Sequence, residues 1–251
     1  MARTPVIGGN WKMNTTRAEA QALLRDLRTR LDALAGIEVV VCPPAAWLGD
    51  AADVLGGSSI EVGAQNVYWE PKGAFTGEVS APMLVGTATQ VIIGHSERRH
   101  VFGETDEATN RKLRAVLDAG LHPILAIGEL REEAEGGQTE AVLRRQITGA
   151  FEGFDALPGD LVVAYEPVWA IGTGLAATAE DAQERCAMVR RILTERFDAP
   201  SADACRIQYG GSVNAGNAAG FAAGADIDGV LVGGASLDGA AFEAICRAFV
   251  A

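Results

Sequence analysis

Short apolar runs alternate with longer amphipathic stretches along this chain. The short runs are rich in valine and isoleucine, whereas the longer stretches repeat their apolar residues with a helical period, and several open on Thr, Ser or Asp. The pattern predicts strands at residues 6–10, 38–42, 60–64, 91–94, 123–127, 161–165, 206–209 and 229–232. It predicts helices at residues 17–34, 107–119, 139–151, 179–196 and 240–249.

Eight strands separated by helices are typical of a single (β/α)8 barrel of parallel strands, the α/β architecture that closes at this number. The main rival is an open doubly wound sheet. Its usual dinucleotide signal, GxGxxG after the first strand, is absent, because Gly8-Gly9-Asn10-Trp11-Lys12 occupies that place. We therefore expect one barrel domain spanning residues 1–251.

Composition narrows the class of protein. Hydrophobic residues make up 48% and charged residues 22%, which is ordinary for a globular chain with a sizeable core. A net charge of −12 argues against a nucleic-acid partner. The first residues lack the apolar region of a signal peptide, and the longest uncharged stretch is too rich in glycine and asparagine to span a membrane. We expect a soluble cytoplasmic protein.

The spacing of the cysteines argues against a metal site or a disulfide framework. They are far apart, without a CxxC pair or clustered histidines, and a reducing compartment fits them. They are Cys42, Cys186, Cys205 and Cys246. We expect no metal and no cofactor.

Polar residues follow several of the predicted strands, where barrels of this type carry their chemistry. Asn10 and Lys12 follow the first strand. Lysine is rare here, with Lys12, Lys72 and Lys112 among 21 basic residues, so Lys12 is either an ammonium for substrate charge or a solvated surface residue. His95 follows the fourth strand, and Ser96 and Glu97 open a helix whose dipole favours a neutral imidazole. The alternative for His95 is a structural role.

Glu166 directly follows the sixth strand. Burial at a strand end raises the pKa of a carboxyl group and makes it a better base near neutral pH, so we expect Glu166 to act as a base rather than as an ordinary loop glutamate. Glu166 is followed by a segment that a proline makes rigid, and then by two glycines that let the backbone move. This combination is typical of an active-site lid. This predicted lid consists of Pro167, Val168, Trp169, Ala170, Ile171, Gly172, Thr173 and Gly174.

Glycine clusters follow the seventh and eighth strands. Gly210-Gly211-Ser212 and Gly233-Gly234 occupy positions where many barrels bind phosphate through backbone N–H groups and a following helix. Glycines also form plain turns, but two such clusters on adjacent strands favour a phosphate site.

Five segments, in order over nearly the whole chain, resemble the triosephosphate isomerase family. They are Asn-Trp-Lys-Met-Asn at 10–14, Gly-His-Ser-Glu-Arg-Arg at 94–99, the segment around Glu166, Tyr-Gly-Gly-Ser-Val at 209–213 and Leu-Val-Gly-Gly-Ala-Ser at 231–236. The resemblance implies interconversion of dihydroxyacetone phosphate and D-glyceraldehyde 3-phosphate, in glycolysis and gluconeogenesis, without metal or organic cofactor. The pairing of a glutamate base with a neutral histidine is implied by the resemblance to the family and does not follow from the spacing of the residues.

The resemblance also implies roles for individual residues. Glu166 moves the carbon-bound proton, His95 polarises the carbonyl, Lys12 offsets negative charge and Asn10 contacts substrate. Phosphate would rest on the N–H groups of Gly172, Ser212, Gly233 and Gly234.

Other implications concern an ion pair and a partner chain. For Glu97 we favour an ion pair with Lys12 over a catalytic role. The aromatic segment 67–80, with Thr76 near its tip, reaches a neighbouring subunit in the family and implies a homodimer; the alternative is that it folds onto its own barrel. The chain departs from the family at Leu175-Ala176-Ala177, where Lys-Thr-Ala is frequent, and at Ala126, where Cys is frequent.

Two other functions stay open from the residues alone. One is an aldolase-type barrel in which Lys12 forms a Schiff base with substrate. The other is a barrel that binds sugar phosphates without catalysis. That second function predicts damage among Asn10, Lys12, His95 and Glu166, and all four are intact.

Overall fold

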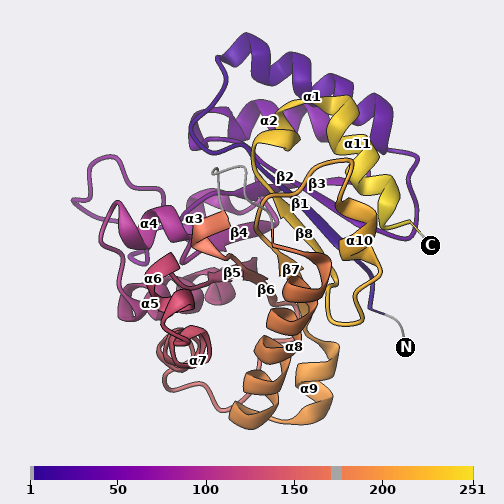
Figure 1. Cartoon of the computed structure of the whole chain (residues 1–251). Coiled ribbons are helices and arrows are strands. Elements are labelled where there is room, and N and C mark those ends of the chain that lie inside the picture. The colour runs from indigo at the N-terminus through magenta and orange to yellow at the C-terminus, as the bar shows by residue number, and fades with distance from the viewer. Residues whose placement is uncertain (1–2, 171–176, 251) are drawn as a thin grey trace.

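The computed structural model describes residues 3–170 and 177–250, and in this part of the chain eight parallel strands form a closed barrel (Figure 1). Neighbours along the chain pair in order, and β8 closes the ring on β1, where Gly8 lies opposite Leu231. The strands are β1 (Val6–Asn10), β2 (Glu38–Cys42), β3 (Ile60–Ala64), β4 (Gln90–Ile93), β5 (His122–Ile127), β6 (Val162–Tyr165), β7 (Arg206–Tyr209) and β8 (Gly229–Val232). The predicted (β/α)8 barrel is confirmed.

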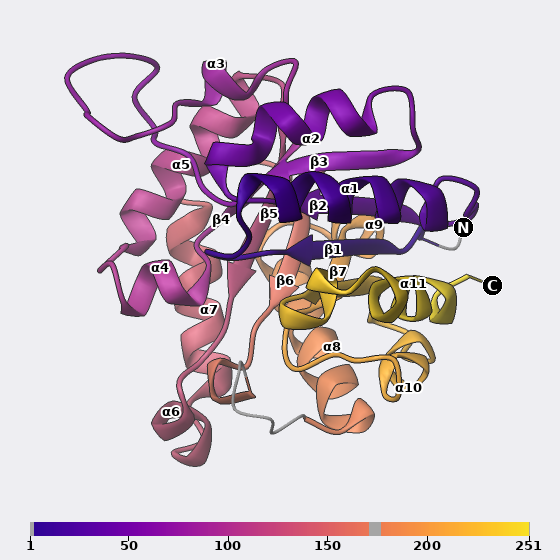
Figure 2. The same ribbon diagram turned by 90° about the horizontal axis from the view of Figure 1, so that it is seen from above.

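Helices surround the strands on the outside of the barrel (Figures 1 and 2). The α-helices are α1 (Arg17–Leu31), α2 (Leu48–Leu55), α3 (Ala81–Leu84), α4 (Ser96–His100), α5 (Asp106–Asp118), α6 (Arg131–Glu135), α7 (Thr139–Ala150), α8 (Ala179–Arg196), α9 (Ala199–Ala204), α10 (Ala218–Ala222) and α11 (Gly239–Ala248). Short 3-10 helices are η1 (Ala45–Trp47), η2 (Val168–Ala170) and η3 (Gly234–Leu237).

Several predicted boundaries were wrong by one to three residues. The fourth strand ends at Ile93, because Gly94 adopts a φ of +68° and turns the chain toward His95. The first helix ends at Leu31 instead of residue 34, because the Asp32 side chain accepts the backbone N–H of Ser59 at 2.7 Å and directs the chain toward β3. Both differences arise from contacts that local periodicity does not contain.

Two apolar layers hold the barrel together. Alternate strand residues, among them Val40, Ile92, Ile124 and Leu231, pack against one another in the barrel interior. The residues between them face outward and pack against buried helix residues such as Leu24. The second layer includes Cys186, Cys205 and Cys246, and all four cysteines of the chain are free and buried.

The barrel brings the ends of its parallel strands together, and this is what positions the site. Asn10, Glu166 and the glycine turns after β7 and β8 all lie at the C-terminal end of the strands. Within the described residues, no helix has the length and apolar character needed to cross a membrane.

Candidate active site

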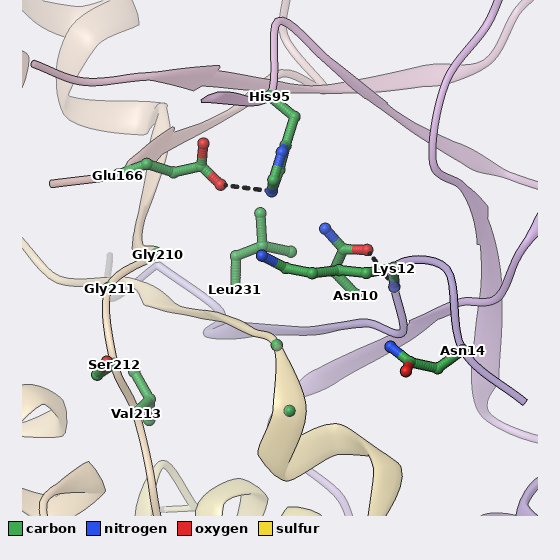
Figure 3. Close-up of a pocket in the computed structure, with 12 residues that line it drawn as sticks. Asn10, Lys12, Asn14, His95, Glu166, Gly210, Gly211, Ser212, Val213 and Leu231 are labelled. Atoms are coloured by element: carbon green, nitrogen blue, oxygen red, sulfur yellow. Dashed lines mark hydrogen bonds and ion pairs between the residues drawn. The ribbon is translucent and has the colours of Figure 1, made fainter. Parts of the chain in front are cut away.

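A cavity of about 290 Å³ opens at the C-terminal end of the strands (Figure 3). The loops that follow β1, β4, β6, β7 and β8 contribute its walls, as expected for a closed ring of parallel strands. Its lining residues are Asn10, Lys12, Asn14, His95, Glu166, Gly210, Gly211, Ser212, Val213, Leu231, Gly233 and Gly234. The structure thus brings together most of the residues that the sequence indicated.

Glu166 and His95 point toward one another across this cavity (Figure 3). The Nε2 atom of His95 lies 3.1 Å from Oε1 of Glu166, and the backbone N–H of Ser96 donates to Oε2 at 3.0 Å. Glu166 is 2% exposed and His95 is 5% exposed. The carboxylate is therefore held by two donors in a largely dry setting, where its hydrogen bonds are strong.

The expected rise in the Glu166 pKa is wrong for this arrangement. Burial raises the pKa of Glu166, but His95 and the Ser96 N–H lower it, and the balance lies below the ordinary value. Both donors stabilise the charged carboxylate. The sequence indicated the burial but not the two hydrogen bonds that oppose it.

The protonation of His95 depends on its other ring nitrogen. Burial lowers the pKa of His95, the charge and hydrogen bond of Glu166 raise it, and the balance lies above the ordinary value. However, the backbone N–H of Glu97 donates to Nδ1 at 3.2 Å, at the start of α4. An imidazolium has no lone pair on Nδ1 to accept this bond. We therefore assign the neutral imidazole, with its proton on Nε2 facing Glu166.

Lys12 has a backbone conformation that is rare outside glycine. Its φ is +52°, which costs about 1–3 kcal/mol and persists only where the surroundings impose it. The Lys12 N–H donates to Oδ1 of Asn10 at 3.0 Å, and Nε2 of Gln65 donates to the Lys12 carbonyl at 2.9 Å and to that of Cys42 at 2.8 Å. The ammonium lies 2.6 Å from Oε1 of Glu97. The predicted ion pair is present.

Ser212 lies on the opposite side of the cavity from His95 (Figure 3), and Gly233 and Gly234 also line the cavity. η3 begins at Gly234, and the Ser236 hydroxyl and N–H both bond to the Gly233 carbonyl, at 2.7 and 2.9 Å. The nearest atom to a Cβ at Gly233 would be Cε of Lys12, at 3.5 Å. The turn is thus fixed beside the lysine.

The predicted lid lies partly within the described residues. Val168, Trp169 and Ala170 form η2, the Trp169 Nε1 donates to Oε1 of Glu129 at 3.1 Å, and the Ser212 hydroxyl donates to the Ala170 carbonyl at 2.6 Å. Pro167 precedes η2. Ile171, Gly172, Thr173 and Gly174, together with Leu175 and Ala176, lie outside the described residues.

Thr76 is not among the residues that line the cavity. It is exposed, in a long loop that projects from the barrel beside α3 (Figure 2). In this loop Tyr68 stacks on Trp69 with ring centroids 4.1 Å apart and contacts Phe75 at 4.7 Å. The loop therefore has a small aromatic cluster of its own.

Several site residues were missed by sequence reasoning. Glu129 is 1% exposed and accepts the Tyr165 hydroxyl at 3.0 Å as well as the Trp169 indole. Burial raises the pKa of Glu129 against these two donors. Gln65 and Glu129 both follow strand ends, and that position was the available signal. Asn14, Val213 and Leu231 also line the cavity.

The described residues contain no group of three or more His, Cys, Asp or Glu side chains that could hold a metal ion. The chemistry available to the cavity is instead that of one carboxylate, one neutral imidazole donor and one ammonium. This set suits proton transfer beside a carbonyl group, with a cation to offset the charge that develops on oxygen.

Comparison with known proteins matches this chain to one family. A family model described as triosephosphate isomerase matches residues 5–249. A triosephosphate isomerase of Symbiobacterium thermophilum is 50% identical over 248 residues, covering 98% of this chain and 97% of that protein. One of Moorella thermoacetica is 52% identical over 248 residues, covering 97% and 98%. One of Dehalococcoides mccartyi is 48% identical over 245 residues, covering 98% and 97%.

Proposed function

This chain belongs to the triosephosphate isomerase family, and from that premise we propose that it interconverts dihydroxyacetone phosphate and D-glyceraldehyde 3-phosphate with Glu166 as the base. The observation that carries the proposal is the buried pair of Glu166 and a His95 that presents an Nε2 proton, 3.1 Å apart beside Lys12. The proposed route passes through an enediol or enediolate.

The first step needs the substrate to separate Glu166 from its present donors. Once its carboxylate leaves His95 and Ser96, the main interactions that lower its pKa are removed, whereas burial, which raises the pKa, and the weaker effect of the Lys12 charge remain. Glu166 then takes the proton from one carbon and returns it to the neighbouring carbon. The same displacement frees the Nε2 proton of His95 for the substrate carbonyl oxygen.

The other residues of the cavity handle charge. Lys12 offsets the negative charge of the enediolate, and Asn10 holds the Lys12 backbone and contacts substrate. Phosphate binds at Ser212, Gly233 and Gly234, with Gly172 supplied by residues 167–174 acting as a lid. The bonds of Trp169 to Glu129 and of Ser212 to Ala170 support this, because they fix the start of that segment at the cavity.

We propose that two copies of the chain associate through the loop that carries Thr76. Large apolar side chains are exposed on this loop and elsewhere on the described surface, and a partner chain could cover them. They are Met13, Phe75, Met83, Val85, Val101 and Phe102. In this proposal each subunit is one domain, and the homodimer acts in the cytoplasm, in glycolysis and gluconeogenesis. Thr76→Arg should yield monomers in sedimentation, whereas a dimeric variant would contradict this interface.

The Schiff-base alternative is not supported. A lysine nucleophile needs its amine free to attack the carbonyl, whereas Nζ of Lys12 forms an ion pair with Oε1 of Glu97 at 2.6 Å. Borohydride should trap no substrate on Lys12. The comparisons also do not support a barrel without catalysis, since the matched relatives bear the name of an isomerase.

A coupled isomerase assay on the purified chain tests the function. We expect turnover of both trioses, and a fall of roughly 10²–10⁴-fold in kcat for Glu166→Gln, because the amide cannot accept the proton. Inhibition by inorganic phosphate should change little, since Glu166 does not belong to the phosphate end of the cavity. A folded wild-type chain without isomerase activity would end the proposal.

A further inference from the structure

The side-chain amide of Gln146 forms two hydrogen bonds with the backbone of Gly128. The Gly128 N–H donates to Oε1 of Gln146 at 2.8 Å, and Nε2 of Gln146 donates to the Gly128 carbonyl at 3.0 Å. Gln146 lies within α7 and is 2% exposed. Because a primary amide carries the same donor and acceptor as a peptide group, Gln146 pairs with Gly128 much as a neighbouring strand would.

The backbone of Gly128 needs this pairing because β4, one of the two neighbours of β5, ends before it. β4 and β5 pair as far as Ile93, which lies opposite Leu125, and the chain then turns away at Gly94. The N–H and carbonyl of Gly128 lie beyond this ladder. Buried backbone groups require partners, and Gln146 supplies both of them across the gap between α7 and the barrel.

On its other side, Gly128 lies directly against the backbone of Glu166. A Cβ added to Gly128 would lie 1.7 Å from the Glu166 carbonyl oxygen and 2.6 Å from its carbonyl carbon. The Glu166 N–H donates to the Ile127 carbonyl at 2.7 Å, and the Val168 N–H donates to the Glu129 carbonyl at 3.1 Å. The backbone of the base is thus held by residues 127–129, and Gln146 fixes the middle one.

We propose that Gln146 is a positioning residue for the isomerase reaction, which sets the place of the Glu166 carboxylate through Gly128. Gln146 is not among the residues that line the cavity. The inference rests on the proposed role of Glu166 as the base. A misplacement of the base by about 1 Å costs roughly 10²-fold in rate, so a small shift of Gly128 is enough to matter.

Gln146→Met tests this proposal, because methionine keeps the length of the side chain and removes both hydrogen bonds. We expect kcat to fall roughly 10–100-fold, while KM and the inhibition constant of inorganic phosphate stay within about twofold. The matched control is Gln208→Met. Gln208 is also fully buried, and its Nε2 donates to the Val6 carbonyl at 2.9 Å inside the barrel. The melting temperature of this control should fall by about as much as that of Gln146→Met, whereas its kcat should match that of wild type.

Gln146→Glu provides the conservative variant. Burial raises the pKa of a carboxyl group, and the protonated acid offers one donor and one acceptor to Gly128, as the amide does. Its kcat relative to wild type should therefore rise as the pH is lowered from 8 to 6. Gln146→Met should show no such recovery, and a flat ratio for both variants contradicts the proposal.

A double-mutant cycle separates this inference from the proposed function. In a Glu166→Gln background there is no base to position, so Gln146→Met should cost no further activity. The inference is overturned if Gln146→Met behaves like Gln208→Met, or if its loss of kcat persists in full without the Glu166 carboxylate. If Glu166→Gln itself retains wild-type turnover, the role of Glu166 fails first and the inference fails with it.

Discussion

Buried charges gather at both ends of the barrel, and the two ends use them differently. At the N-terminal end, Arg190 donates to Asp226 at 2.6 Å and to Asp228 at 2.7 Å, and also to two backbone carbonyls. Arg3 donates to Asp228 at 2.6 Å as well. At the C-terminal end, Glu166 is held by one neutral ring and one backbone N–H, beside an open cavity.

The size of a cavity does not distinguish the two ends. The N-terminal end has the larger one, about 540 Å³ against about 290 Å³. Its charged lining residues, Arg3 and Asp228, already bond to each other. At the other end, the strained Lys12 and the His95–Glu166 pair are arranged so that a ligand can take over their bonds. The candidate site is therefore distinguished by hydrogen bonds that a ligand can replace. At the N-terminal end the charged groups bond to one another, in closed networks that stabilise the fold.

The largest expected effect tests the stabilising end. Arg190→Met removes the ion pairs to Asp226 and Asp228, and it leaves Asp228, which is 6% exposed, with Arg3 as its remaining cation. Removing one side of a buried ion pair costs about 3–5 kcal/mol. Equilibrium unfolding in urea at fixed protein concentration measures the loss, with Arg25→Met on the surface of α1 as the control. Below the unfolding transition kcat should match wild type, and a selective fall in kcat would break the comparison.

The next effect tests the C-terminal end of the barrel, where a ligand can replace the hydrogen bonds of Glu166. Glu166→Asp shortens the side chain by one methylene and withdraws the carboxylate from the substrate carbon. We expect kcat to fall about 10²-fold, equivalent to about 2.7 kcal/mol, with little loss of stability. Steady-state kinetics and phosphate inhibition measure it, beside Glu107→Asp on the surface of α5. Equal losses of kcat in the two variants would remove the distinction.

A smaller effect concerns the strained lysine. Gln65→Leu removes both hydrogen bonds to the Lys12 and Cys42 carbonyls, so Lys12 can relax toward negative φ and shift its ammonium. We expect kcat/KM to fall about tenfold, equivalent to about 1.4 kcal/mol. Gln21→Leu serves as the control, because it also removes two hydrogen bonds, one to Asp50 on α2 and one from Arg25 on α1, away from Lys12. An unchanged kcat/KM would mean that Asn10 alone holds the Lys12 backbone.

Most of the fold followed from the sequence because most strands are short runs rich in Val and Ile, and long periodic helices separate several of them. Helices of four to six residues, such as α3, α9 and α10, were missed because so few residues show no period. Their bounds depend on packing and capping, as where the Asp198 carboxylate caps α9.

The candidate site followed from the ends of the predicted strands, where the sequence has Lys12, His95 and Glu166. The direction of the Glu166 pKa did not follow, because it depends on donors from the β4 loop that meet it only in space. Gln146 gave no signal, since a glutamine within an amphipathic helix resembles an ordinary surface residue. Contacts that join distant segments were thus the part that the sequence did not reveal.

The smallest effect concerns an ion-pair network between α7 and α8 on the outside of the barrel. Glu140 on α7 accepts from Arg144 at 2.9 Å and forms an ion pair with Arg191 of α8 at 2.9 Å. Hydrogen bonds from Arg191 and Arg144 lower the pKa of Glu140 to about 2. Because the pKa is lower in the folded state, these pairs stabilise the fold above the ordinary carboxyl pKa, and the contribution is lost as the pH falls toward 2.

Glu140→Gln should therefore lower the melting temperature only slightly at pH 7, since exposed pairs contribute little. The difference from wild type should shrink as the pH falls below about 4.5, and it should also shrink in high salt. Thermal unfolding at several pH values measures it, with Glu135→Gln on α6 as the control. A difference that grows on acidification would contradict the depressed pKa. In that case the exposed ion pairs of Glu140 would not stabilise the barrel, in contrast to the buried ion pairs of Arg190 at its N-terminal end.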